Sequence, residues 1–285
     1  MFTRQPATPA GGHASIRAHL ERAGTMHTTT KRLRAITRAV GAGLAECELS
    51  FVERAAIDPE RAAAQHGAYV QCLRALGCEV LAMPPLSGHA DAVFVEDTAV
   101  VLPELAVLTR PGAPSRRGEV ASIAAVLAPY RRCVSLQAPG TLDGGDVLRV
   151  GRCIYVGSSA RSNAEGIEQL RVAVAPHGYS VVAVETRDCL HLKSAVTQVG
   201  ENRLLINPDW VDRAVFAAYA QIEIDPGEPH AANVLRIGDA LVYPDNFPKT
   251  RARREKAGAV VHALDVSELQ KAEGAVTCCS LVFEA

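Results

Sequence analysis

The sequence has no apolar run that approaches the ~20 residues that a helix needs to cross a bilayer. Its opening stretch also lacks the apolar segment of a secretory signal peptide. Charge of one sign is not in excess either, because 30 Lys and Arg residues balance 31 Asp and Glu residues, which leaves a net charge of -1. Such a chain has no electrostatic reason to bind nucleic acid or an anionic membrane. We therefore expect a cytoplasmic protein whose partners are small molecules.

The eight cysteines form no C-x-x-C pair and are too sparse for a disulfide scaffold, so we expect free thiols. Two of them, Cys278 and Cys279, are adjacent near the end of the chain, in "GAVTCCSLVFEA". A buried cysteine usually acts as a small hydrophobic residue. Either thiol is therefore a candidate nucleophile only if the fold brings suitable partners beside it.

Residues 1–31 contain scattered Pro, Gly and Thr and show neither helical nor strand periodicity, which predicts an N-terminal extension before a single domain over 32–285. Met26 is an alternative start of the chain. Within the domain, helical patterns alternate with paired strand-like runs. Helices are expected near 58–77, 117–130, 163–178, 209–220 and 248–258, and hairpins in "VFVEDTAVVLPELAVLTR", "GGDVLRVGRCIYVG", "HLKSAVTQVGENRLLIN" and "ANVLRIGDALVYP".

Five residues that can carry chemistry recur at a nearly constant spacing, each at the start of an apolar strand. Intervals of 49, 45, 42 and 45 residues separate Asp97, Asp146, His191, Asn233 and Cys278. Five repeats of strands and a helix, none of which can bury its own faces, can close radially around one axis. This predicts an α/β fold of five repeats in which a carboxylate, a histidine and a cysteine share one mouth, as a nucleophilic site requires.

The stretch "DAVFVED" (91–97) places three carboxylates, those of Asp91, Glu96 and Asp97, around an apolar run. If it is a strand, alternation puts Asp91 and Asp97 on one face, and charges of this kind often mark only a solvated edge. A buried cluster of carboxylates is costly unless a cation binds in it, and a planar guanidinium accepts carboxylates as bidentate partners.

Three other stretches are suggestive, although none is specific by itself. His191 in "CLHLKSAV" precedes a strand, where a lone histidine is more often a core residue than a catalyst. "TLDGGD" (141–146) allows close backbone approach or simply forms a tight turn. Arg116 and Arg117 lie at an expected helix start, where arginine is unfavourable unless it binds an anion.

Together these stretches resemble the dimethylarginine dimethylaminohydrolases, members of the guanidino-group modifying (pentein) superfamily. The resemblance covers about residues 32–285 and implies a five-bladed α/β propeller. It also implies hydrolysis of asymmetric dimethylarginine or monomethylarginine to citrulline and a methylated amine, without a metal or organic cofactor. The stretches that carry it, in chain order, are "FVEDTAVV", "TRPGAPSRRGE", "TLDGGDVL", "GSSARSNAEG", "LHLKSAV", "AAN" and "TCCSLVF".

The resemblance also implies roles for individual residues. Cys278 is similar in position to the nucleophile and His191 to the proton donor and acceptor, with Asp143 as the carboxylate that orients the histidine. Some bacterial relatives carry glutamate at that position, so this aspartate has a shorter reach. The positions that match substrate contacts are Asp91, Glu96, Asp97, Arg116 and Arg161, together with Leu49 in a mobile lid and the backbone carbonyl of Ala272.

Strand alternation predicts that Cys278 faces the central mouth while Cys279 points away into packing. A zinc site made of Cys278, Cys279 and His191 is an alternative, but adjacent cysteines do not easily share one tetrahedral ion. An arginine or agmatine deiminase, or a non-catalytic binding protein of the same superfamily, are the alternative functions. Both a monomer and a homodimer are compatible with the sequence.

The carboxylates around the expected site should surround the empty pocket with negative charge. Negative charge disfavours a thiolate, so the pKa of Cys278 should stand at or above its ordinary value of ~8.5. A bound guanidinium neutralises that charge, and we expect it to lower the pKa of the thiol and so generate the nucleophile.

Overall fold

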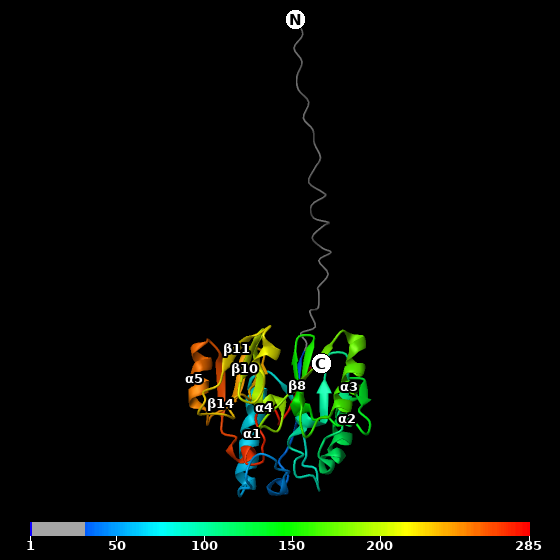
Figure 1. Ribbon diagram of the computed structural model, residues 1–285. Helices are drawn as coiled ribbons and strands as arrows, with labels where there is room; N and C mark the ends of the chain where they lie inside the picture. The colour runs from blue at the N-terminus through cyan, green and yellow to red at the C-terminus, as the bar shows by residue number, and fades with distance from the viewer. Residues whose placement is uncertain (2–31) are drawn as a thin grey trace. The chain divides into compact units, whose positions relative to one another are not determined.

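The computed structural model describes Met1 and residues 32–285 (Figure 1). The extension expected over residues 1–31 therefore lies, apart from Met1, outside the described residues. Residues Arg32–Ala285 form one compact unit that contains five three-stranded sheets. No helix within the described part of the chain is both long enough and apolar enough to span a membrane.

Four of the sheets share one plan, in which two antiparallel strands form a hairpin and a third strand runs parallel to the middle one. The expected hairpins are thus confirmed. The four sheets comprise β3 (Ala99–Val101), β4 (Ala106–Leu108) and β5 (Cys133–Ser135); β6 (Val147–Val150), β7 (Cys153–Ser158) and β8 (Ser180–Glu185); β9 (Val196–Gly200), β10 (Arg203–Ile206) and β11 (Ala220–Glu223); and β12 (Leu235–Ile237), β13 (Ala240–Pro244) and β14 (Val260–Leu264).

A crossover helix connects the middle strand to the third strand in each of these sheets, because parallel neighbours cannot be joined by a tight turn. Figure 1 shows α3 and α5 at the outer edges of the described domain. The connections are η4 (Pro114–Glu119) with α2 (Val120–Leu127), α3 (Ala164–Val174) with η6 (Ala175–His177), η7 (Arg213–Phe216), and α5 (Pro248–Lys256).

The fifth sheet is completed by both ends of the domain. Its middle strand β1 (Leu33–Arg38) pairs antiparallel with the final strand β15 (Leu281–Glu284) and parallel with β2 (Glu79–Met83). Helix α1 (Pro59–Ala75) connects β1 to β2. Since the last strand completes the first blade, the ring of five sheets closes, and the segment that carries Cys278 is held inside it.

Helix α1 begins and ends where its sequence predicts. The side chain of Asp58 accepts hydrogen bonds from the backbone N–H groups of Glu60 and Arg61, and Pro59 occupies the first turn, where it removes no intrahelical bond. Gly77 follows the helix with a φ of 88°, a left-handed conformation that glycine adopts without a steric cost.

Two local expectations are wrong. The stretch 91–97 is not an alternating strand, because it forms turns followed by the 3-10 helix η3 (Val95–Thr98), so its carboxylates are not sorted by strand alternation. The helix expected over 209–220 is reduced to η7, because Val211 pairs with Thr186 in an isolated bridge and β11 already begins at Ala220.

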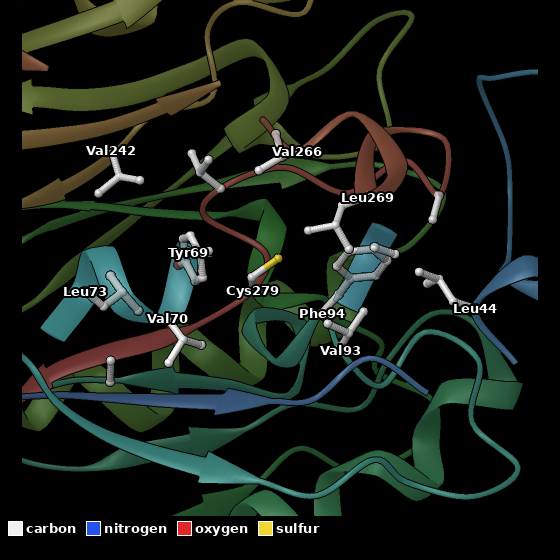
Figure 2. Packing of buried hydrophobic residues seen from close by; sticks show 14 of the residues in the cluster. Leu44, Tyr69, Val70, Leu73, Val93, Phe94, Val242, Val266, Leu269 and Cys279 are labelled. Carbon is white, nitrogen blue, oxygen red and sulfur yellow. The ribbon is translucent and has the colours of Figure 1, made fainter. Parts of the chain in front are cut away.

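The core consists of five clusters of buried apolar residues rather than one continuous centre. Figure 2 shows the cluster around α1, in which the sulfur of Cys279 lies among Tyr69, Phe94 and Leu269. Cys279 is thus packed away from the surface, as expected. The reason differs from the expected one, since both cysteines lie in a turn before β15 and not in the strand itself.

Candidate active site

The five regularly spaced residues all lie within a few residues of the first strand of their blade, and α4 separates His191 from β9. Short helical turns or loops, and not strand starts, hold them there, and these turns include η5 (Gly144–Asp146) and α4 (Leu192–Ala195). Asp97 lies in η3, Asp146 in η5, His191 at the N-cap of α4, Asn233 in the loop before β12, and Cys278 in the turn before β15.

A cavity of about 20 Å³ brings most of the candidate site residues together. A volume of that size holds about one water molecule, so the site is closed to any larger ligand in this conformation. The cavity is lined by seven of the ten expected residues, Asp91, Asp97, Arg116, Arg161, His191, Ala272 and Cys278, and also by Glu48, Phe94, Leu190, Glu273 and Gly274.

The imidazole of His191 lies among carboxylates. Its Nε2 atom is 3.1 Å from Oδ2 of Asp143 and 3.9 Å from Oδ1 of Asp97. Burial by itself lowers the pKa of His191, but the negative charges of Asp97, Asp143 and Asp146 outweigh it and raise that pKa to about 9. The imidazole is therefore protonated near neutral pH and can donate a proton.

Asp143 lies directly behind His191 without lining the cavity itself. The side chain is fully buried, and its Oδ1 atom accepts a hydrogen bond of 2.9 Å from the backbone N–H of Gly112. The backbone N–H of Asp143 in turn donates to the hydroxyl of Ser162. These contacts fix the carboxylate so that it can hold the imidazole in one orientation.

Asp146, which the sequence placed at a strand start, has a structural role beside the histidine. Its carboxylate accepts 2.6 Å hydrogen bonds from the hydroxyls of Ser159 and Ser162 and a 2.9 Å bond from the backbone N–H of Leu192. Because Leu192 begins α4, these bonds hold the turn that carries His191.

The thiol of Cys278 faces a negative environment. Burial, followed by the charges of Glu96 and Asp97, raises the pKa of this thiol to about 12. The direction agrees with the expectation that carboxylates disfavour the thiolate in the empty site. The hydroxyl of Thr277 lies 4.0 Å from the sulfur of Cys278.

Arg116 holds Asp97 in place. Its Nη1 atom is 2.5 Å from Oδ2 of Asp97, and its other donors reach the carboxylate of Glu119 and the carbonyl oxygen of Phe94. Burial opposes ionisation of Asp97, but the positive charges of His191 and Arg116 lower the pKa of that carboxyl to about 2. Asp97 therefore stays ionised, and its other oxygen, Oδ1, faces His191.

Glu96 does not line the small cavity. Its carboxylate accepts a 2.5 Å bond from Nζ of Lys193 and a 2.8 Å bond from the hydroxyl of Thr277. Both Glu96 and Lys193 line a different cavity of about 550 Å³. Burial raises the pKa of Glu96 even though Lys193 lies beside it. Direct contact of Glu96 with a substrate stays a prediction.

Leu49 is half-buried and packs against the cluster around α1, and it is absent from the lining of the small cavity. The residues that flank Leu49, Glu48 and Ser50, are the ones that contact residues of the site. The backbone N–H of Glu48 donates a 3.2 Å hydrogen bond to Oδ2 of Asp91, and Nη2 of Arg161 lies 3.4 Å from the hydroxyl of Ser50.

Sequence reasoning missed Glu48 and Glu273, both of which line the small cavity. Glu273 adopts a φ of 57° and accepts hydrogen bonds from the backbone N–H groups of three consecutive residues, Ser50, Phe51 and Val52. No pattern in the sequence marks this role, because the partners are more than 220 residues apart.

Among the described residues, Asp97, Asp143 and His191 form a group with the spacing of metal ligands, since their donor atoms lie within 4.8 Å of one another. They fit a hydrogen-bond network better than a metal site, because Asp97 is already ion-paired with Arg116 and an ion would have to displace the proton of His191, whose pKa is raised to about 9. The alternative zinc site built on both cysteines is wrong, since Cys279 is buried in the apolar cluster and does not line the cavity.

A five-bladed α/β propeller whose blades converge on a cysteine, a histidine and carboxylates defines the class of guanidino-group modifying, or pentein, proteins. Residues 46–221 match the family model described as N,N dimethylarginine dimethylhydrolase, eukaryotic. The chain is also 40% identical over 250 residues to an N(G),N(G)-dimethylarginine dimethylaminohydrolase of Streptomyces coelicolor, which covers 87% of this chain and 96% of the relative. This chain belongs to the dimethylarginine dimethylaminohydrolase family.

Solved structures of the family agree with this assignment. One is a dimethylarginine dimethylaminohydrolase in which a histidine is replaced by glycine, as an adduct with S-methyl-L-thiocitrulline. It matches with a TM-score of 0.85 and 33% identity, over 88% of this chain and 99% of that one. The Pseudomonas aeruginosa protein, as a cysteine-to-serine variant complexed with citrulline, matches with a TM-score of 0.82 and 32% identity, over 88% and 98% of the two chains.

Proposed function

We propose that this protein hydrolyses the guanidino group of asymmetric dimethylarginine and monomethylarginine, giving citrulline and dimethylamine or methylamine. The observation that carries the proposal is the convergence of Cys278, His191 and Asp97 on one small cavity in a chain of this family. The substrate is a small cation, in keeping with the buried carboxylates that surround the thiol.

In the proposed reaction, Cys278 is the nucleophile. The guanidinium carbon is stabilised by resonance and is a poor electrophile, so a thiolate is the side chain best suited to attack it. Binding of the cation offsets the charges of Asp91 and Asp97, and the thiol loses its proton to solvent. The thiolate then forms a C–S bond, which gives a neutral tetrahedral adduct, while the carboxylates fix the plane of the guanidino group.

His191 then acts as general acid and afterwards as general base. Its imidazolium transfers a proton to the substituted nitrogen, the C–N bond breaks, and the methylated amine leaves an S-alkylthiouronium intermediate on the cysteine. The neutral imidazole next accepts a proton from water as the oxygen adds to the same carbon. The hydroxyl of this adduct loses its proton to solvent as the C–S bond breaks, which releases citrulline and restores the thiolate. Asp143 orients the imidazole throughout.

The remaining substrate contacts are proposed on the family resemblance and on position. Arg161 and Ala272 line the cavity. The guanidinium of Arg161 and the backbone carbonyl of Ala272 would hold the amino-acid end of the ligand. Leu49 would contribute through the loop that carries Glu48 and Ser50. Arg116 would act on the ligand through Asp97, since its donors are already engaged.

We propose further that the protein acts in the cytoplasm on small molecules, as a monomer or homodimer, without nucleic acid, metal or organic cofactor. The test of the function is amine release from four substrates: asymmetric dimethylarginine, monomethylarginine, arginine and agmatine. Dimethylamine and methylamine release with little ammonia supports the proposal. Preferential ammonia release from arginine or agmatine would instead identify a deiminase, and no release from any of them a binding protein.

A further inference from the structure

Glu273 joins two segments that are far apart in the sequence. Its carboxylate accepts 3.0 Å hydrogen bonds from the backbone N–H of Ser50 and a 2.8 Å bond from that of Val52, and it also accepts from the N–H of Phe51. Three consecutive amides thus converge on one anion, a geometry typical of backbone anion sites.

The two sides of this contact differ in how firmly they are held. Glu273 follows α6 (Ser267–Gln270), and its own N–H donates to the carbonyl of Gln270, while the next residue, Gly274, donates to the carbonyl of Leu269. Gly274 is also packed so closely that a side chain there would collide with the ring of Phe94. The base of Glu273 is therefore fixed.

The opposite segment has much weaker support. Among the described residues, no backbone-to-backbone hydrogen bond outside the helices and strands involves residues 48–57, and these residues lie in no helix or strand. The amides of 50–52 are held by the carboxylate of Glu273. The other hydrogen bonds of this segment all involve side chains: the N–H of Glu48 donates to Asp91, the hydroxyl of Ser115 to the carboxylate of Glu48, Arg161 to the hydroxyl of Ser50, Arg54 to the carbonyls of Ala45 and Cys47, and Lys271 to the carbonyl of Ala56. A segment without backbone-to-backbone hydrogen bonds, held through side chains, opens at a lower free-energy cost than a helix or strand.

Glu273 also stands in the wall between two cavities. The small cavity of about 20 Å³ that contains the thiol shares Leu190, Glu273 and Gly274 with a second cavity of about 290 Å³. Phe51 and Val52 line the second cavity. Since the small cavity is too small for an arginine derivative, its lining must rearrange before such a ligand can reach Cys278, and this wall is the part that it shares with the cavity of about 290 Å³.

We propose that Glu273 is a latch: its carboxylate holds residues 48–52 closed over the active site, and substrate gains access through the cavity of about 290 Å³ when the three amides are released. Glu273 is thus a positioning residue, which acts through the loop and not on the reacting atoms. The proposal rests on the proposed function for the identity of the ligand, but opening of the latch is measurable without turnover.

The single tryptophan supplies the readout. Trp210 is 8% exposed and lines the cavity of about 290 Å³ together with Phe51 and Val52. When the loop opens, the indole becomes accessible to a small neutral quencher such as acrylamide. We expect the Glu273→Ala and Glu273→Gly variants to raise the acrylamide quenching constant of Trp210 at least about two-fold, because the open population grows.

Two further variants separate the loss of the three amide bonds from a mere change of charge or size at this wall. Glu273→Gln retains one acceptor oxygen and should give an intermediate quenching constant, which also covers the case in which the smaller variants do not fold. Asp188→Asn is the matched control, since Asp188 carries the same charge, has a φ of 49° and lines the same cavity without a hydrogen bond to residues 48–52. The acrylamide quenching constant of Trp210 in this variant should equal that of the wild type.

Turnover adds a second criterion. Loss of the latch should raise KM for asymmetric dimethylarginine about five-fold or more while kcat changes less, because closure is lost and the reacting groups are untouched. If Glu273 has no role beyond adopting a left-handed backbone conformation, Glu273→Gly should have the quenching constant and the KM of the wild type.

A wild-type quenching constant in both the Glu273→Ala and Glu273→Gly variants would overturn the latch. An equal rise of the quenching constant in Asp188→Asn would also overturn it. Failure of the wild type to release amine would refute the proposed function and leave the quenching result intact.

Discussion

Oδ2 of Asp143 and Nε2 of His191 lie 3.1 Å apart although they come from neighbouring blades and are separated by 48 residues. The contact gives the imidazole one fixed orientation and adds to the charges that keep it protonated. A carboxylate that positions a catalytic histidine in this way is sensitive to the loss of charge as well as to the loss of shape.

Asp143→Asn should keep the geometry and remove the charge. We expect kcat to fall about 10²-fold, since the imidazole is less readily protonated and its favoured tautomer changes. NMR titration of His191 should show a lower pKa than in the wild type. Glu168→Gln, at an exposed site, serves as the control for a lost carboxylate and should change neither quantity. An unchanged pKa of His191 in Asp143→Asn would contradict the assigned role.

Protonation of His191 should stabilise the fold in a definite pH window. The pKa of His191 is about 9 in the folded protein, against an ordinary value of 6.5, so its stabilising effect is complete below pH 6.5 and is lost as pH rises through 9. The difference corresponds to on the order of 3 kcal/mol. Urea denaturation of the wild type and of His191→Gln at several pH values measures it. A stability difference that stays constant from pH 6 to pH 10 would show that folding does not raise the pKa of His191.

The adjacent cysteines should behave differently. Cys278→Ser should abolish turnover and leave the melting temperature nearly unchanged, because the side chain is only partly buried and lies at the cavity. Cys279→Ser should keep most of the activity and cost about 1 to 3 kcal/mol of stability, since a hydroxyl replaces a thiol in an apolar cluster. Thermal melts and amine release measure both. Equal loss of activity in two well-folded variants would refute the distinction.

Ligand binding should activate the thiol. With a pKa raised to about 12 in the empty site, Cys278 should show little thiolate absorbance at pH 8, and a non-reactive guanidinium compound should increase that absorbance. The same titration on Cys278→Ser gives the background from the other cysteines. A thiolate present well below pH 7 and unaffected by the ligand would point instead to a permanent ion pair with His191.

Residues 1–31 should be dispensable. A protein that begins at Arg32 retains every strand of the five sheets, because β1 starts at Leu33. We expect its melting temperature and kcat/KM to match those of the full chain within error. A large decrease in either value would show that the extension packs on the domain or contributes to the site.

The local sequence determined where α1 begins and ends and where the hairpins form. Asp58, Pro59 and Gly77 mark the ends of α1 through capping and backbone preferences that act within a few residues. Paired apolar runs around turns likewise predicted the hairpins. The repeat spacing, from Asp97 to Cys278, indicated five units, since each unit must fill a similar volume around the same axis. The family resemblance pointed to most of the residues that line the cavity.

Only the tertiary structure decided which of these residues line the small cavity around Cys278 and which line the cavity of about 550 Å³. Glu96 and Asp97 are adjacent, yet η3 turns one toward Lys193 and the other toward His191, where strand alternation would have been a false guide. The contact between Glu273 and Ser50 is likewise invisible in the sequence. Short-range patterns depend on neighbouring residues along the chain, whereas charge pairing and cavity shape depend on distances that exist only after the five blades have closed.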